Sequence, residues 1–255
     1  MSATEGEISP SAIGRARDAH EPSPRPRALV LLDARRAFLA VRARPLAGLT
    51  LALMLALSLA PPLVFVSRVD TTEVLMREMK KSGRMDQVPQ EQLEQMRDVG
   101  GKAMAVMLPV GAVGKRAGWI FVVTALVFLL LRGARPELRF SSVLGAVALG
   151  CAPLALHDLI TALTFLIKDP LSLPDTQNVV LSNPAAWLLK DTGRSVVGAL
   201  LKGLDFFELW SCALVALGVG VVAKAKGIVP WAASFGLHAV TVGFSLIGPA
   251  FSSGG

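Results

Sequence analysis

Apolar residues along this chain are gathered into long blocks that alternate with charged segments. A helix needs roughly 20 residues, with a range of about 17–25, to cross the hydrocarbon core of a bilayer. The blocks 45–67 and 228–255 meet this length without a formal charge. The block that starts at Phe140 meets it by continuing through His157 and Asp158 to Ile167. These three blocks predict membrane-spanning helices.

Two further apolar blocks, 117–131 and 209–223, are shorter. Each reaches only about 22 Å at 1.5 Å per residue. Lys115, Arg116 and Lys224 flank them, and long basic side chains extend a span by placing their charges at the interface. We therefore predict an all-α integral membrane bundle of five transmembrane helices, over residues 29–251. The predicted spans are 45–67, 114–132, 141–167, 204–223 and 228–251.

The segments before the first span are polar or amphipathic. Residues 1–28 are rich in proline and charge and are predicted to be a disordered cytosolic tail. Leu31, Ala34, Phe38 and Val41 then recur at helical spacing, with arginines around them. This pattern predicts an amphipathic helix on the membrane surface. The alternative is an ordinary soluble helix that packs against the loops.

Two of the connections between spans are long. Residues 68–102 are predicted to be an outer loop with two short amphipathic helices, the second starting at Pro89. Residues 103–114 either extend the second span outward or lie at the interface. Residues 168–202 contain acidic and basic residues in balance and are interpreted as a loop.

Charge sets the predicted orientation. Apolar residues make up 53% of the chain and charged residues 18%, with a net charge of +7. The short loops 132–139 and 224–227 are basic, which places them and the N-terminus on the cytoplasmic side of a cell inner membrane. Five spans then put the C-terminus outside. No basic stripe with interleaved aromatic residues occurs, so we expect no nucleic-acid partner.

The sequence lacks the common motifs of catalysis and cofactor binding. It contains no G-x-S-x-G, H-E-x-x-H, P-loop or C-x-x-C pattern. The cysteines, Cys151 and Cys212, lie inside apolar blocks and are interpreted as small apolar side chains. We therefore expect no enzyme activity, no metal and no cofactor.

His157 and Asp158 are the first candidate site. They lie roughly 25 Å along the third span, and ionisable residues at membrane depth are commonly functional. Thr161 follows one turn later and is placed to hydrogen-bond to either side chain. The alternative is an interfacial polar cluster in which Asp158 pairs with Lys168 or Lys190.

Asp205 and Glu208 are the second candidate site, because residues three apart share one face of a helix. They are either a functional carboxylate pair or residues that favour the start of a helix, where Asp205 fits the N-cap position and Lys202 lies close enough to neutralise one of them. His238, midway along the last span, is interpreted as a packed, hydrogen-bonded histidine.

Three segments carry a resemblance to a known family. ARRAFLAVRARP, residues 34–45, is an amphipathic segment that ends in proline at the first span. FSSVLGAVALGCAPLAL, residues 140–156, has small residues and Pro153 within the third span. In LDFFELW, four residues match an L-D-x-F-x-x-W entry to a fourth span: Leu204, Asp205, Phe207 and Trp210. Over about residues 30–250 the chain resembles the Yip-one domain family, the Ypt/Rab-interacting five-span membrane proteins, and in particular its prokaryotic branch.

The resemblance implies a five-helix bundle with a cytosolic N-terminus. Eukaryotic members of the family bind small GTPases and partner membrane proteins, but this chain contains no tyrosine and lacks their tyrosine motifs, so GTPase binding is not carried over. We expect a non-enzymatic membrane protein that acts in membrane organisation or trafficking-like roles, through the bilayer and a membrane-protein partner or a second copy. The alternative is a small transporter or ion-conducting protein that uses His157 and Asp158, with Thr161 and Glu208 nearby.

Overall fold

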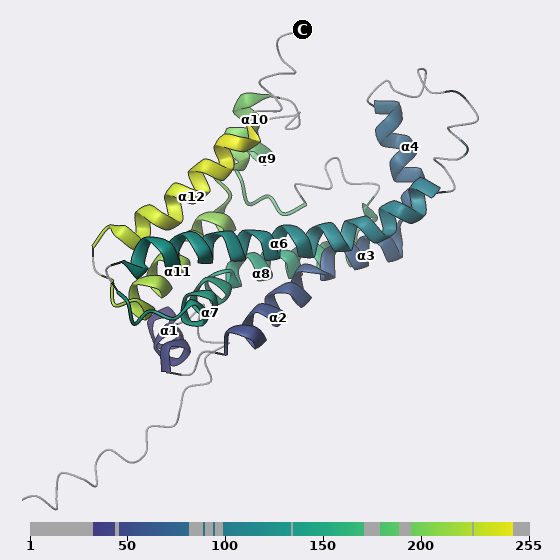
Figure 1. Cartoon of the computed structure of the whole chain (residues 1–255). Helices are drawn as coiled ribbons and strands as arrows, with labels where there is room; N and C mark the ends of the chain where they lie inside the picture. The colour runs from purple at the N-terminus through teal and green to yellow at the C-terminus, as the bar shows by residue number, and fades with distance from the viewer. Residues whose placement is uncertain are drawn as a thin grey trace, which may run out of the picture.

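The computed structural model describes residues 33–43, 46–81, 89, 94, 99–133, 135–170, 179–188, 195–225 and 227–246. Within these residues the fold is helical and contains no strand, which confirms the all-α class. The helices are drawn in Figure 1. In chain order they are α1 (Ala34–Ala43), α2 (Ala47–Ser58), α3 (Ala60–Arg68), α4 (Thr71–Lys81), α6 (Gly101–Arg132), α7 (Phe140–Gly150), α8 (Ala152–Ile167), α9 (Ala185–Leu188), α10 (Val196–Lys202), α11 (Phe206–Val222) and α12 (Val229–Ser245).

Three helical segments of the described chain are long and apolar enough to cross a membrane: Ala47–Arg68, Gly101–Arg132 and Phe140–Ile167. They correspond to the first three predicted spans, with the first segment beginning two residues later than predicted. A fourth crossing is obtained if α10 and α11, which meet at a bend of 50°, form one broken span. With 17 residues, α12 reaches about 26 Å, somewhat less than a core of about 30 Å. Three to four spans are therefore supported, and the count of five stays a prediction.

Prolines divide two of these spans. Pro61 and Pro62 lie in the first turn of α3, directly after the break at Leu59. Pro153 lies in the first turn of α8, directly after the break at Cys151. Proline has no backbone N–H to donate and clashes with the preceding turn, so each break falls just before the proline. The sequence predicted these spans as uninterrupted helices.

The second span differs most from its predicted limits. The sequence placed its start at residue 114, whereas α6 begins at Gly101 and continues through Pro109 to Arg132. The apolar segment 103–114 is therefore helical and continuous with the predicted span. The hydroxyl of Thr71 in α4 donates a hydrogen bond of 2.7 Å to the carbonyl of Gly101, which joins α4 to the start of α6. The helix predicted to start at Pro89 falls almost wholly outside the described residues.

The segment 168–202 was interpreted as a loop, and this was wrong for its last part. It includes α9 and α10, and α10 starts one residue after Ser195. The hydroxyl of Ser195 accepts a hydrogen bond of 2.9 Å from the Gly198 amide, as an N-cap residue does. The run VVGALLK that follows is apolar enough to pack against α12. The capping serine before an apolar run was the missed signal.

The core lies where α1 crosses the bundle. Ala37, Phe38 and Val41 are buried, and α1 packs against α7 and α11. The ring of Phe38 lies directly over Gly218, where a β-carbon would come within 2.5 Å of it. The apolar face of α1 therefore contacts α7 and α11, and these three side chains are not available to lipid. The alternative interpretation expected packing within the protein, but against the loops.

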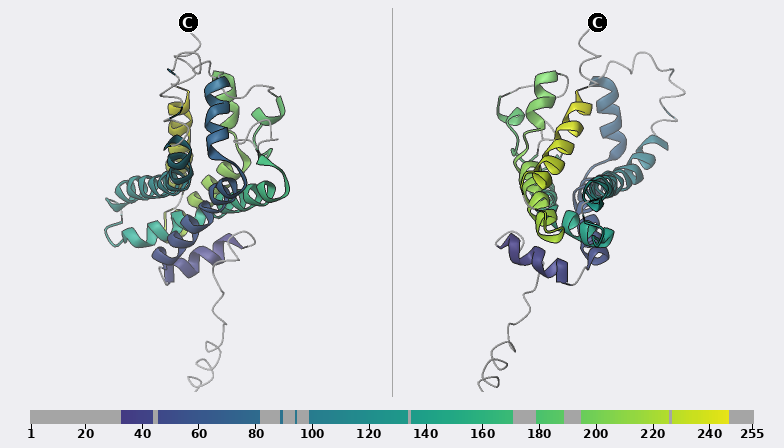
Figure 2. Two further views of the ribbon diagram at one scale, coloured as in Figure 1. Left: turned by 90° about the vertical axis from the view of Figure 1, so that its right-hand side faces the viewer. Right: turned by 60° about the vertical axis from the view of Figure 1, so that its left-hand side comes forward.

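The two short basic loops meet at this same end of the bundle, which we call the α1 end. The Arg135 guanidinium donates a hydrogen bond of 3.3 Å to the carbonyl of Lys224. From here α6 and α12, which are in contact, run apart towards the opposite end (Figures 1 and 2). We call that opposite end the cavity end.

Candidate binding cavity

A cavity of about 840 Å³ occupies the cavity end, between α6 and α8 on one side and α10, α11 and α12 on the other. Its lining includes three basic side chains, three acidic side chains and two histidines. They are Lys115, Arg116 and Lys202, then Asp158, Asp205 and Glu208, and finally His157 and His238. The packed core around α1 lies beyond its inner wall, where Ser211 donates a hydrogen bond of 3.0 Å to the Gly150 carbonyl.

Arg116 and Asp158 form an ion pair across the cavity wall. A guanidinium nitrogen of Arg116 in α6 lies 2.7 Å from a carboxylate oxygen of Asp158 in α8, and the side chains are 17% and 15% exposed. Arg116 stands about 24 Å from Arg132 along α6, with the apolar stretch 117–131 between them. The pair thus marks one end of that stretch. The partner of Asp158 is thus an arginine 42 residues earlier in the chain and not Lys168, and Lys190 lies outside the described residues.

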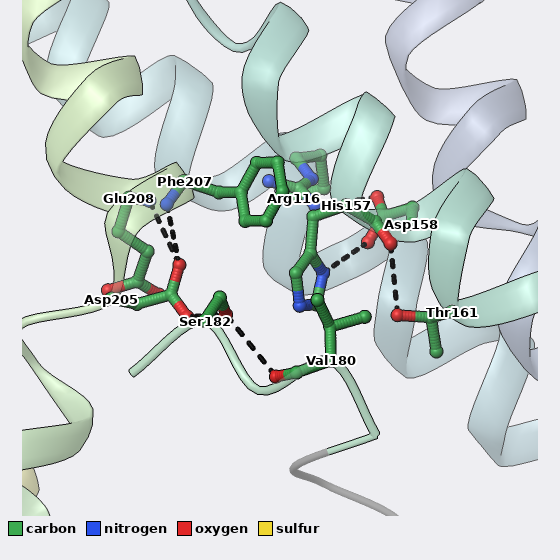
Figure 3. A network of polar contacts seen from close by, with 9 residues as sticks. All are labelled: Arg116, His157, Asp158, Thr161, Val180, Ser182, Asp205, Phe207 and Glu208. Carbon is green, nitrogen blue, oxygen red and sulfur yellow. Dashed lines mark hydrogen bonds and ion pairs between the residues drawn. The ribbon is translucent and has the colours of Figure 1, made fainter. Parts of the chain in front are cut away.

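His157 lies beside the pair without a short hydrogen bond to it (Figure 3). Its Nδ1 atom is 3.9 Å from an Asp158 carboxylate oxygen, and its ring meets Phe207 edge to face with 5.2 Å between centroids. The Thr161 hydroxyl donates a hydrogen bond of 2.9 Å to the His157 backbone carbonyl. Thr161 therefore does not bind either side chain, as the sequence had suggested, because a threonine in a helix readily donates to the carbonyl one turn earlier.

Asp205 is the N-cap of α11, which confirms the capping prediction. One carboxylate oxygen accepts hydrogen bonds from the amides of Phe207 at 2.8 Å and Glu208 at 3.2 Å (Figure 3). The other carboxylate oxygen accepts a hydrogen bond from the Ser182 hydroxyl. The Phe206 amide in turn donates a hydrogen bond of 3.0 Å to the Ser182 carbonyl. Asp205 therefore fixes both the start of α11 and the loop that covers it.

The remaining residues of the family-like entry have structural positions. The rings of Phe206 and Phe207 meet edge to face at 5.4 Å, and the ring of Trp210 lies 5.6 Å from that of Phe206. Leu204 is exposed in the turn before α11. Pro153, the other family-like residue, is fully buried at the start of α8.

Glu208 and His238 are neighbours in the cavity lining. The His238 Nε2 atom lies 2.8 Å from the carbonyl oxygen of Gly203, and because a carbonyl only accepts, this nitrogen carries a hydrogen. The Nδ1 atom is then 3.9 Å from a carboxylate oxygen of Glu208. His238 is thus packed and hydrogen-bonded as predicted, and it also contributes to the cavity.

Lys115 and Lys202 differ from the other charges of the lining. Among the described residues, neither lies within ion-pair distance of an acidic side chain. Lys202 therefore does not neutralise Asp205 or Glu208 directly. Sequence reasoning had treated Lys115 and Arg116 only as interfacial ends of a span, because it could not place α6 beside α8 and α11.

The described residues contain no group of three histidine, cysteine or acidic side chains arranged to hold a metal ion. Cys151 and Cys212 are both free and buried. Cys212 reaches the inner wall of the cavity, where its backbone carbonyl accepts a hydrogen bond of 2.9 Å from Ser234. The lining therefore offers a ligand both positive and negative charges, and both hydrogen-bond donors and acceptors.

The fold defines a helical protein with several segments able to cross a membrane, as in multi-pass membrane proteins. Comparison with known proteins found no matching family model, no similar curated protein and no similar solved structure.

Proposed function

We propose that this protein is a non-enzymatic, multi-pass membrane protein that binds a small charged molecule in the cavity. The observation that carries the proposal is the gathering of ionisable side chains around one cavity at the end of the apolar stretch of α6. Ionisable residues at membrane depth are costly and usually mark a binding site or a pathway. A volume of about 840 Å³ is that of a small-molecule site rather than of a single ion.

The charged side chains of the lining that already have partners within the protein are not available to a ligand, and the others are. Asp158 is already neutralised by Arg116, and Asp205 is occupied by α11 and Ser182. Glu208, whose side chain is 47% exposed, and the unpaired Lys115 and Lys202 are open to a ligand. This shifts the site from His157 and Asp158, the pair on which the transport alternative rested, to Glu208, Lys115 and Lys202.

The cavity is closed towards α1 by packed side chains, so its open end defines the side from which a ligand enters. The basic loops at the α1 end support a cytoplasmic N-terminus. On that orientation, with five spans, the cavity opens to the outside of an inner membrane. Uptake of a ligand from that side is the first step both of a transporter and of a protein that organises lipid.

We also propose that the chain shares its ancestry with the Yip-one domain family, which it resembles. Its most specific residues, Asp205, Phe207 and Trp210, have a local role at the start of α11. That role supports a shared fold and says little about a shared partner. A membrane-protein partner or a second copy is compatible with binding in the cavity, since the lining lies within one chain.

Ligand binding to the purified protein tests the proposal. Charged solutes and headgroup esters are screened for a rise in Tm, because a ligand that binds only the folded state stabilises it by mass action. In Thr241→Trp a large side chain replaces a small one in the cavity lining, whereas Val240, the site of the control Val240→Trp, is exposed and outside the lining. We expect at least one ligand to stabilise the wild type and the control but not Thr241→Trp. A screen without any stabilising ligand, or an equal response of both variants, contradicts the proposal.

A further inference from the structure

The open charges of the cavity have both signs and stand on different walls. Lys115 is on α6 and Lys202 is at the end of α10, while Glu208 is in the first turn of α11. A ligand with only one kind of charge would leave part of this set without a partner. A ligand that carries both an anionic and a cationic group gives every member of the set a partner.

The basic side suits a phosphate ester. Two lysine ammonium groups, each with three rotatable donors, bind phosphate as point charges without demanding a fixed geometry. Neither lysine has an acidic partner within 4.0 Å among the described residues, so each is free to bind an anion in the cavity. The Arg116 guanidinium stands next to Lys115 but is held by Asp158.

The acidic side suits a primary amine. Glu208 presents acceptor oxygens to the cavity, and its neighbour His238 has its Nε2–H engaged by the Gly203 carbonyl. A primary ammonium donates hydrogen bonds to such a carboxylate, whereas a quaternary ammonium has no hydrogen to donate. The site therefore distinguishes ethanolamine from choline by hydrogen bonding.

The position of the cavity matches a lipid headgroup as one source of this chemistry. Lys115 directly precedes Arg116, which in turn directly precedes the apolar stretch 117–131. It therefore lies about 25 Å from Arg132 along α6. In a bilayer whose hydrocarbon core is about 30 Å thick, this is close to the level where headgroups begin.

We propose that the cavity binds an amine-bearing phosphate ester, the chemistry shared by phosphatidylethanolamine and free glycerophosphoethanolamine. Lys115 and Lys202 hold the phosphate and Glu208 holds the ammonium group. This assignment rests on the proposed function, in which the cavity is a binding site.

Binding of four compounds to the purified full chain tests the assignment: phosphatidylethanolamine, phosphatidylcholine and phosphatidylglycerol in mixed micelles, and glycerophosphoethanolamine in solution. Kd is obtained from the ligand dependence of Tm. We expect phosphatidylethanolamine to bind at least tenfold more tightly than the other two lipids. Equal affinity for glycerophosphoethanolamine identifies the free ester as sufficient, and binding of the lipid alone identifies the lipid as the source; both support the assignment.

Three variants separate the two halves of the site. Glu208→Gln should lose the preference for phosphatidylethanolamine over phosphatidylglycerol while still binding both. Lys115→Gln and Lys202→Gln should each weaken both lipids about tenfold. Lys102→Gln, an exposed lysine on α6 outside the lining, should bind as the wild type does.

Equal affinity for all three lipids, or a preference that survives Glu208→Gln, overturns the assignment. If none of the four compounds binds but another ligand of the screen does, the assignment fails and the cavity still has a binding function. If nothing binds at all, both proposals fail.

Discussion

Arg116 of α6 and Asp158 of α8 lie 2.7 Å apart, and each side chain is less than one-fifth exposed. The two residues come from different candidate spans and join them at the level of the cavity. The contact explains how an aspartate within an apolar helix is tolerated. It also changes the interpretation of Asp158, because the charge of this candidate site residue is neutralised within the protein.

The first prediction concerns this ion pair. Removing one partner leaves the other charge without compensation, and for fully buried pairs this costs about 3–5 kcal/mol. Because both side chains keep some exposure, we expect Arg116→Gln or Asp158→Asn to lower stability by about 2 kcal/mol. The double variant should recover part of the loss. Thermal unfolding in detergent micelles measures all three, and a double variant whose loss equals the sum of the single losses would show that the two side chains are not coupled.

The second prediction concerns the contact between α1 and the bundle. Truncation of a buried phenyl ring typically costs about 3–5 kcal/mol, and Phe38 is fully buried on Gly218. We expect Phe38→Ala to release α1, with faster amide hydrogen exchange in residues 34–43. Leu39, which is exposed on the same helix, is the control, and Leu39→Ala should leave the exchange unchanged. Unchanged exchange in Phe38→Ala would contradict the packing described for α1.

The third prediction concerns helix contact at Gly150. A β-carbon there would lie 2.6–3.0 Å from atoms of Val215, two of which are backbone atoms, so α7 and α11 would have to separate. We expect Gly150→Ala to destabilise the protein by about 1–3 kcal/mol. Gly114→Ala, where nothing lies within 4 Å, should be neutral or stabilising, because alanine is the better helix former. Similar Tm changes for the two variants would contradict this difference.

The fourth prediction concerns the cap of α11. Asparagine accepts the same backbone hydrogen bonds as Asp205, whereas leucine accepts none, and loss of a cap costs about 1 kcal/mol. Asp205→Asn should therefore stay close to the wild type in Tm, and Asp205→Leu should melt at a lower temperature. Equal melting of the two variants would remove the capping role.

Sequence patterns went furthest where the cause is local. The apolar blocks predicted the first three spans, and the spacing of Asp205 to the amides after it predicted the cap, because both depend on neighbours along the chain. The start of α6 was harder to predict, since no breaker separates residues 103–114 from the span and Pro109 is accommodated within the helix. Local pattern also understated α10, which is short and depends on packing against α12.

The site was only partly predictable because it is assembled from distant segments. Asp158, His157 and Glu208 were recognised from their position in apolar surroundings. Arg116 and Lys115 were assigned to the interface, and nothing in the sequence pairs α6 with α8 at that level.

The most direct test of the account asks whether the cavity is open to water from one side of the membrane. In a background with Cys151→Ala and Cys212→Ala, single cysteines replace Thr241, which lines the cavity, or Val240, its exposed neighbour outside the lining. Intact vesicles of both orientations are treated with a membrane-impermeant thiol reagent. The account predicts that Thr241→Cys reacts from the side opposite the N-terminus only, and that Val240→Cys, which faces lipid, does not react. Protection of Thr241→Cys from both sides, or reaction from the N-terminal side, would contradict it.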